Sequence, residues 1–468
     1  MKKPAWALVA LGLSLGLGVL PSGVSGAQDI DVDALANEAV QRVREYVRIN
    51  TINPPGNEIR AAEFFAAIFE AEGIDYEIAE SAPGRGNIWA RLEGGDEPAL
   101  VLLHHSDVVP ADERFWDTDP LSGELRDGYI YGRGAMDTKA GGILHLQTFL
   151  ALHRAGVPLN RDVIFMATAD EEAGGLYGAG WLVENRPEVF EDVGLLLNEG
   201  GFGWGADGQE RFGVEVTQKV PLWLKLVAHG EPGHGAWPAA ATSVTRLVAA
   251  LERIRTHPFE PRIVPVVDAN FKKMSPLEDE PWRSRFADMA STIRDPALLA
   301  EFRESYPSLH PLIRNTCSIT MLEGSTKINV VPPEATAQLD CRLLPDQDPE
   351  AFTEELTALI DDPDIDIERT MGFSPAVSTT DTDLYRAIEA GVTHRFPDAV
   401  VLPLVQPGFT DSHFFRDLGI VSYGFFPMVI SQEDFPRAHG NNERVTVENV
   451  KRGTRMMLEI VRAVVEEP

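Results

Sequence analysis

The chain has 468 residues, a length that allows two domains. It is 44% hydrophobic and 24% charged, which is ordinary for a soluble globular protein. Its 41 basic and 72 acidic side chains give a net charge of −31. Such an excess of negative charge argues against nucleic acid or an anionic membrane as a partner.

The N-terminus has the pattern of a secretory signal peptide. Two lysines precede the apolar run 5–20, and small residues follow at 24–27. We expect 1–27 to be cleaved, which removes both lysines, changes the net charge from −31 to −33 and places the mature protein in the periplasm or outside the cell. An uncleaved anchor is the alternative. No other run is apolar and long enough to span a bilayer, so no membrane contact is expected after cleavage.

The first part of the mature chain, 28–213, alternates between helix and strand patterns. Helices are expected at 31–50, 57–72, 140–155 and 175–185, and strands at 74–79, 87–92, 98–104, 161–168 and 193–198. This alternation predicts an α/β catalytic domain with a mainly parallel sheet sandwiched by helices. Catalytic groups in such a fold lie at the carboxyl ends of strands.

The pattern changes near residue 214. We expect an alternating strand at 214–229, helices at 240–255 and near 295–305, and an irregular, Pro-rich and charged segment at 256–283. The segment 214–344 is therefore predicted to be a separate α+β unit inserted into the catalytic domain. The α/β pattern then resumes at 345–468, with helices at 349–360, 381–395 and 446–465 and strands at 365–370 and 399–404.

The two cysteines, Cys317 and Cys341, lie in stretches that alternate like strands. If 315–322 and 335–344 pair as a hairpin centred near residue 329, the cysteines come opposite one another. An exported protein meets oxidising conditions, so a disulfide and two free thiols are equal alternatives.

Histidine and acidic side chains follow several of the apolar runs. His105 and Asp107 end one run two residues apart, so they project to the same side of a strand. This spacing allows His105 to bind a metal while Asp107 fixes its ring. In isolation, a histidine at this position more often simply ends a strand.

Further carboxylates stand at comparable positions. Asp137 follows a Gly-rich turn, where a lone Asp is usually a helix cap, and Glu199 ends another apolar run. The acidic triplet 170–172 is costly unless a cation or proton compensates its charge. His439 lies in a polar loop, where a lone His is normally solvated. Together the set suits two divalent metals that share a carboxylate, with one Glu left as a base, as in a hydrolase that activates water.

Seven motifs support this interpretation. They are Leu-Leu-His-His-Ser-Asp-Val-Val-Pro, Gly-Arg-Gly-Ala-Met-Asp-Thr-Lys-Ala-Gly, Thr-Ala-Asp-Glu-Glu-Ala-Gly-Gly, Asn-Glu-Gly-Gly, Gly-Glu-Pro-Gly-His-Gly-Ala, Ile-Asn-Val-Val-Pro-Pro and Ala-His-Gly-Asn-Asn-Glu. In this order, from about residue 45 onward, they resemble the zinc exopeptidase family of aminoacylase, glutamate carboxypeptidase and succinyl-diaminopimelate desuccinylase. The resemblance is nearest to the carboxypeptidase S branch.

The resemblance implies a metal-ligand set. One Zn²⁺ would be held by His105 and Glu199, and the other by Glu172 and His439. Asp137 would bridge the two ions, and the peptide bond that follows it would be cis. Co²⁺ or Mn²⁺ are alternatives to zinc, because affinity order alone does not decide occupancy.

The resemblance also implies catalytic residues. Glu171 would be the general base that activates a metal-bridging water, and Asp107 would orient the histidine ligand of the first metal. In the inserted unit, His234 would stabilise the oxyanion, often across a dimer interface, although it could be a plain turn residue.

Three further residues would contact the substrate. Asn329 matches a substrate-contacting residue, and Gly408 lies where relatives place backbone contacts. Arg342 would clasp a substrate carboxylate, which the strongly negative chain would otherwise repel.

The sequence therefore predicts a secreted di-zinc hydrolase that cleaves an amide bond next to a free carboxylate, in the manner of a carboxypeptidase or dipeptidase. An N-acyl-amino-acid amidohydrolase is the alternative substrate class. A non-catalytic exported protein that binds zinc or peptide is the alternative of another kind, which the presence of the base and every ligand disfavours. The expected partners are a small peptide or N-acyl amino acid and a second copy of the chain, through the inserted unit.

Overall fold

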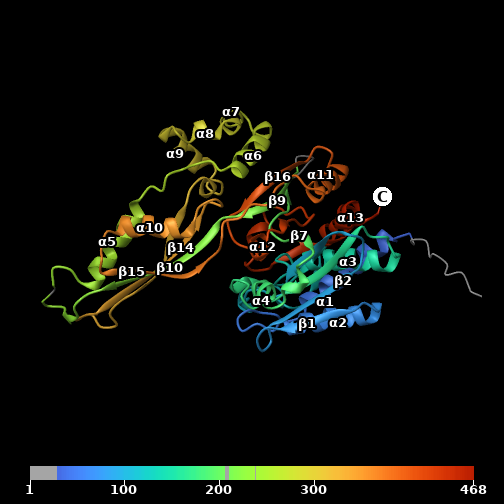
Figure 1. The fold of residues 1–468 in the computed structure, drawn as a ribbon, viewed down its shortest axis with the longest axis horizontal. Coiled ribbons are helices and arrows are strands. Elements are labelled where there is room, and N and C mark those ends of the chain that lie inside the picture. The colour runs from blue at the N-terminus through green and yellow to red at the C-terminus, as the bar shows by residue number, and fades with distance from the viewer. Residues whose placement is uncertain (1–28, 206–209, 238, 468) are drawn as a thin grey trace, which may run out of the picture.

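The computed structural model describes residues 29–205, 210–237 and 239–467 (Figure 1). The predicted signal peptide, 1–27, lies outside these residues. Within them, no helix combines the length and the apolar character needed to cross a membrane.

A nine-stranded sheet forms the centre of the larger unit. Its order is β1 (Tyr76–Glu80), β2 (Gly86–Leu92), β6 (Arg161–Thr168), β3 (Glu97–His105), β7 (Val193–Asn198), β17 (Val421–Gly424), β9 (Arg211–Gln218) and β16 (Val400–Gln406), with β8 (Gly203–Trp204) paired to β9. β3 runs parallel to both β6 and β7, and β17 runs parallel to β7. β1 and β2 form an antiparallel edge.

Helices cover both faces of this sheet. One face carries α1 (Val32–Val47), α2 (Ile59–Glu72), α3 (Lys139–Ala155), α11 (Asp383–Arg395) and α13 (Val447–Val465), and the other carries α4 (Ala179–Asn185) and α12 (Ser412–Asp417). Along β3, Leu100 and Leu102 enter the first core, whereas Val101 and Leu103 enter the second. Because successive side chains of a strand point to opposite faces, a strand buried on both sides must be continuously apolar. The predicted α/β sandwich is confirmed.

A small three-stranded sheet adjoins the larger unit and contains β4 (Glu124–Arg126), β5 (Tyr129–Tyr131) and β18 (Arg444–Thr446). It brings the loop before the last helix beside the Gly-rich turn that follows β5, because β18 pairs with β5.

The inserted unit has an antiparallel sheet of four strands, which extends away from the larger unit in Figure 1. Its order is β12 (Thr316–Glu323), β14 (Glu334–Leu343), β10 (Val220–His229) and β15 (Ile365–Gly372). Helices α5 (Ser243–Thr256) and α10 (Pro349–Ile360) share one core with it. A two-stranded ribbon of β11 (Gly233–His234) and β13 (Val330–Val331) completes the unit.

Strand pairing divides the chain differently from the sequence pattern. The stretch 214–229 contains the end of β9, which joins the large sheet, and all of β10, which joins the small one. The expected boundary at 213/214 therefore falls inside β9, and the change of sheet comes at Lys219. The strand expected at 365–370 is β15, which pairs with β10 and so belongs to the four-stranded sheet of the inserted unit. The helix expected at 349–360 is α10, which packs in the core of the same unit. Amphipathic periodicity does not specify which sheet a strand joins.

The expectation of an irregular segment at 256–283 was wrong. The structure has α6 (Pro265–Met274) and α7 (Trp282–Ala287) there, followed by α8 (Met289–Thr292) and α9 (Pro296–Ser305). Pro265 and Pro296 occupy the first turns of their helices, where the missing N–H is not needed. These helices share a core with Leu402 and Val405 of β16, so they cover that edge of the large sheet.

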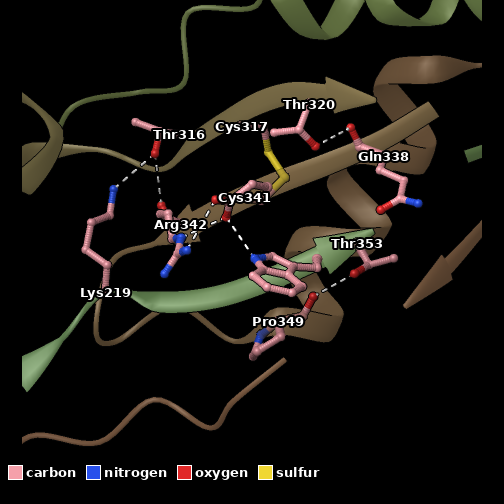
Figure 2. The surroundings of a disulfide bond; sticks show 11 residues. Lys219, Thr316, Cys317, Thr320, Gln338, Cys341, Arg342, Pro349 and Thr353 are labelled. Atoms are coloured by element: carbon pink, nitrogen blue, oxygen red, sulfur yellow. Dashed lines mark hydrogen bonds and ion pairs between the residues drawn. A yellow bond between two sulfur atoms is a disulfide. The ribbon is translucent and has the colours of Figure 1, made fainter. Parts of the chain in front are cut away.

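The predicted hairpin around the cysteines is confirmed. β12 pairs antiparallel with β14, and Cys317 lies directly opposite Cys341. A disulfide bond joins them (Figure 2). The bond ties β12, which is an edge strand of the small sheet, to its neighbour.

Candidate metal centre

The predicted ligands meet at the carboxyl ends of three neighbouring strands. His105 is the last residue of β3, the acidic triplet 170–172 follows β6, and Glu199 follows β7. Because β3 lies between β6 and β7 and is parallel to both, these three ends share one edge of the sheet. Polar side chains collect at this edge because each apolar run stops where its strand leaves the core.

Two groups of possible metal ligands share Asp137. In the first, His105 Nε2 lies 3.2 Å from Asp137 Oδ1 and 3.5 Å from Glu199 Oε2. In the second, His439 Nε2 lies 3.1 Å from Asp137 Oδ2 and 3.1 Å from Glu172 Oε2. The two oxygens of Asp137 therefore face different histidines, which is the geometry of a bridging carboxylate.

The charges in this cluster suit cations. Burial raises the pKa of Glu172 to about 7 and also raises the pKa of Glu199. Hydrogen bonds to Asp137 and Glu172 raise the pKa of His439 to about 10. Protons therefore compensate the crowded carboxylates, a task that divalent cations would perform when bound. Imidazole and carboxylate donors fit zinc, cobalt or manganese.

Asp107 connects the strand ends behind the ligands. Its Oδ1 lies 3.3 Å from His105 Nδ1 and accepts a hydrogen bond of 3.2 Å from the backbone N–H of Glu171. Its Oδ2 accepts from the backbone N–H of Glu172 at 3.2 Å and from the side chain of Asn53 at 2.8 Å. Asp107 thus holds the histidine ring and the acidic triplet in a fixed relation.

Glu171 is a buried carboxyl that belongs to neither ligand group. It begins a single 3₁₀ turn after β6 and is 6% exposed. Burial, together with the charge of Glu199, raises its pKa well above the usual range. A carboxyl group that favours its protonated form beside the ligands can take and return a proton.

Glu443 fixes the loop that carries Asp137, a role that the sequence did not reveal. Its Oε1 accepts from the backbone N–H groups of Met136 at 2.8 Å and of Asp137 at 3.0 Å. Its Oε2 accepts from Arg133 Nη1 at 2.7 Å and from another backbone N–H of the loop at 3.1 Å. The peptide bond between Asp137 and Thr138 is cis, as the family resemblance implies.

Asp411 is a second residue that the sequence did not single out as functional. It is 2% exposed, and its Oδ2 accepts a hydrogen bond of 2.9 Å from the hydroxyl of Thr168, at the end of β6. Burial raises its pKa well above the usual range, and the charges of Asp107 and Glu199 act in the same direction. In the sequence, Asp411 is the third residue of the stretch Phe-Thr-Asp-Ser-His-Phe-Phe at 409–415, and this stretch could have indicated it.

Arg342 and Gly408 lie where the inserted unit joins the large sheet. Arg342 follows Cys341 on β14 and stands opposite Pro221, near the start of β10 (Figure 2). Its guanidinium lies 5.7 Å from the ring centre of Phe409, the residue after Gly408. Its Nε donates to Asp340 Oδ1 at 2.7 Å, whereas its buried Nη1 has no hydrogen-bond partner in the part of the chain that the structure describes.

His234 and Asn329 lie together at the other end of the inserted unit. His234 pairs with Val330 in the ribbon of β11 and β13, and Asn329 O accepts from the N–H of Gly235 at 2.9 Å. The ten residues of β10 separate this ribbon from the junction, which is about 30 Å for an extended strand. Neither ligand group found among the described residues includes His234.

Comparison with known proteins identifies this arrangement. The model of peptidase family M20/M25/M40 matches residues 101–463. The chain belongs to this family. All five residues of the two ligand groups lie within the matched range. The chain is thus a hydrolase of the metallopeptidase and amidohydrolase class.

Relatives support the assignment. The chain is 31% identical over 413 residues to an N-fatty-acyl-amino acid synthase/hydrolase from Xenopus tropicalis, a match that covers 85% of this chain and 78% of the relative. It is 28% identical over 375 residues to a probable carboxypeptidase S-like protein from Dictyostelium discoideum, covering 78% and 71%. A metallo-carboxypeptidase from Sulfolobus solfataricus has the same fold, with a TM-score of 0.70, 18% identity and coverage of 91% and 98%.

Proposed function

We propose that the chain hydrolyses the amide bond of an N-acyl amino acid, using two divalent metals at the ligand groups that share Asp137. The observation that carries the proposal is the position of buried Glu171 beside these groups. The sequence alone placed peptides before N-acyl amino acids. The 31% identity to an N-fatty-acyl-amino acid hydrolase over 85% of the chain reverses that order.

The chain's own groups would divide the chemistry between them. Bound cations would polarise the scissile carbonyl and lower the pKa of a water molecule. Glu171 would take the proton from the attacking water and pass it to the leaving amine, which becomes the free amino group of the product. Asp107 would keep the histidine ligand in the tautomer and orientation that binding requires.

Arg342 would bind the free carboxylate of the substrate. Its Nη1 is buried without a partner in the described structure, and the guanidinium lies 5.7 Å from the centre of the Phe409 ring at the domain junction. Asp340 occupies two of the other guanidinium nitrogens. A substrate carboxylate would therefore compete with Asp340 for part of this group, while Gly408 offers open backbone beside it.

We further propose that His234 serves the metal centre of a second copy of the chain. It lies about 30 Å from the junction of its own chain, counted along β10. Large exposed apolar side chains gather at the same end of the inserted unit: Trp237 is 82% exposed, Ile328 104% and Leu322 64%. Several large exposed apolar side chains at one end of a unit indicate a protein interface, and a symmetric dimer would cover them.

We also propose that the protein is exported. The signal-like N-terminus predicts this, and the Cys317–Cys341 disulfide is typical of an oxidising compartment. Sequencing the N-terminus of the mature protein is the test, and we expect it to begin near residue 28. A mature chain that begins at Met1 would contradict the proposal.

The variant Glu171→Gln tests the catalytic role of Glu171. We expect turnover of N-acyl amino acids to fall by about 10²–10⁴-fold, the usual contribution of a general base. The metal content, measured by elemental analysis, should remain at two ions per chain because Glu171 belongs to neither ligand group. Retained activity would refute the assigned base, and loss of metal would make Glu171 a ligand instead.

A paired substrate panel tests the reaction itself. Dipeptides and N-acyl amino acids with the same C-terminal residue should be compared with and without a chelator. We expect chelator-sensitive hydrolysis, with N-acyl amino acids preferred. Hydrolysis confined to dipeptides would restore the peptidase alternative. Absence of any hydrolysis by protein with two metals bound would favour a binding protein.

Mixing two inactive variants tests the role of His234 across the dimer. A chain with His234→Ala keeps Glu171, and a chain with Glu171→Gln keeps His234. If His234 acts on the partner, half of the sites in mixed dimers are complete, so random exchange restores about one quarter of wild-type activity. If His234 acts within its own chain, no site is complete and no activity returns.

A further inference from the structure

An apolar cavity of about 200 Å³ adjoins the metal centre. Two of the proposed ligands, Asp137 and Glu199, form part of its wall. Most of the apolar wall comes from the segment that follows Glu199 and from the segment between β17 and His439. Its large apolar side chains there are Phe202, Phe426, Met428, Ile430 and Phe435, and Met136 and Ala438 complete the apolar wall.

The side chains of the cavity wall are held in place by packing. Met428 and Ile430 are 2% and 6% exposed, so their side chains are fixed by the core. The ring of Phe202 lies 5.5 Å from that of Phe435 and 6.3 Å from that of Trp204. Trp204 in turn packs on the core formed by α6–α9 and β16, so these additional helices support the cavity from behind. Such preformed apolar pockets are typical ligand sites.

None of the described residues that line the cavity is cationic. Gln406 and Thr138 supply its neutral polar groups, and its charged groups are the two acidic ligands. A free carboxylate would be repelled there, so the charged end of a substrate must lie elsewhere. The candidate for that end is Arg342, which is not among the residues that line the cavity.

We propose that this cavity binds the acyl chain of the substrate and sets its preferred length, an inference that rests on the proposed function. The acyl chain begins at the scissile carbonyl carbon, which reacts at the metals and therefore beside Asp137 and Glu199. The amino-acid side chain shares its carbon with the carboxylate, so it must stay close to Arg342.

The cavity volume sets the length. An apolar cavity of about 150 Å³ holds a benzene molecule. The 200 Å³ of this cavity therefore fits an acyl chain of about six to eight carbon atoms. Longer chains would extend past Phe435, which is 56% exposed, into solvent.

The first experiment measures kcat/KM for one amino acid carrying acetyl, butanoyl, hexanoyl, octanoyl, dodecanoyl and hexadecanoyl groups. Each buried methylene contributes about four-fold, so acetyl to hexanoyl should rise by on the order of 10²-fold. The curve should then level off near octanoyl. A flat series, or a steady rise through hexadecanoyl, would overturn the proposal.

The second experiment alters the wall. Phe435→Ala removes an exposed ring and should lower the ratio of octanoyl to acetyl kcat/KM by about 10-fold. Met428→Ala enlarges the cavity and should move the plateau to longer chains. Leu418→Ala, a truncation of a 49% exposed residue outside the cavity, is the matched control and should keep the ratio of the unaltered protein. An unchanged ratio in Phe435→Ala would refute the assignment of this wall.

The third experiment separates this inference from the proposed function. Calorimetric binding of the same acyl series to metal-loaded Glu171→Gln should show the same rise and plateau in affinity, independently of turnover. An octanoyl series with Gly, Leu and Phe as the amino acid should vary less than the acyl series. If the amino-acid side chain dominates instead, the cavity binds that side chain and the inference fails while the hydrolase stands. If only dipeptides bind, then the proposed N-acyl amino acid substrate and the acyl-chain role of the cavity are both wrong.

Discussion

Replacing Glu443 by Gln should damage the metal centre although Glu443 touches no proposed metal. Its carboxylate is completely buried and accepts four hydrogen bonds, two on each oxygen. Glutamine has only one acceptor oxygen, which can serve one pair of these donors. Its NH₂ group would face the other pair and cannot accept from them. Burial raises the pKa of Glu443, whereas Arg133 and the backbone N–H groups lower it and favour the ionised form.

The magnitude follows from the groups left unpaired. Two buried donors lose their acceptor at about 1–3 kcal/mol each. Loss of the negative charge leaves Arg133, which is 2% exposed, without its ion-pair partner, and breaking a buried pair costs about 3–5 kcal/mol. These contributions overlap, so we expect a loss of about 3–5 kcal/mol in the free energy of unfolding. Because Asp137 sits on the same loop, metal affinity should fall by about 10–100-fold.

The assay is urea denaturation of the metal-free protein, combined with metal titration by calorimetry. Glu433→Gln is the matched control, because it is the same chemical change at a 70% exposed carboxylate that pairs with Arg444, where the cost should stay below about 1 kcal/mol. If Glu443→Gln costs as little as the control and binds metal normally, then Glu443 does not position the loop.

Three further predictions concern stability. Replacing both Cys317 and Cys341 by alanine opens a loop with a sequence separation of 24, which should cost about 3.5 kcal/mol in urea denaturation; no loss would mean that the pair is reduced in the native protein. Burial raises the pKa of Glu38, but hydrogen bonds and charges from Arg154 and Arg42 outweigh it and lower the pKa to about 2. The resulting stability, about 1–2 kcal/mol after solvent screening, is complete above pH 4.5 and is lost as the pH falls toward 2. Glu38→Gln should therefore be destabilising at pH 7 and much less so at pH 3, and an equal effect at both values would contradict this. In Gly178→Ala, the new Cβ would lie 1.8 Å from a carbonyl oxygen just past β6. We expect the free energy of unfolding to fall by about 3 kcal/mol and metal binding to weaken. A melting temperature equal to that of the wild type would show that the backbone at this strand end can move to make room.

The sequence predicted the candidate metal ligands and most of the elements that carry them. Buried strands are apolar along their length, so the point at which β3, β6 and β7 end is visible as a change of composition. Parallel strands then bring His105, the triplet 170–172 and Glu199 together without further information. Asp137 and His439 come from loops, and only the family motifs assigned them to the same centre. Strand alternation also placed Cys317 opposite Cys341, because this is a contact between neighbours in a hairpin, but it left a disulfide and two free thiols as equal alternatives, and the structure decided for the disulfide.

Only the tertiary structure decided which sheet each strand joins. β9 and β10 read as one alternating stretch, yet they belong to different sheets, since pairing depends on partners far away in the chain. For the same reason Glu443 had no visible role: its four donors lie about 300 residues earlier. The length of β10 places His234 far from the junction between the inserted unit and the large sheet, and this distance is the reason to propose that His234 acts in a second copy of the chain. The apolar cavity is likewise built from separated segments, so its size could not be read from local sequence.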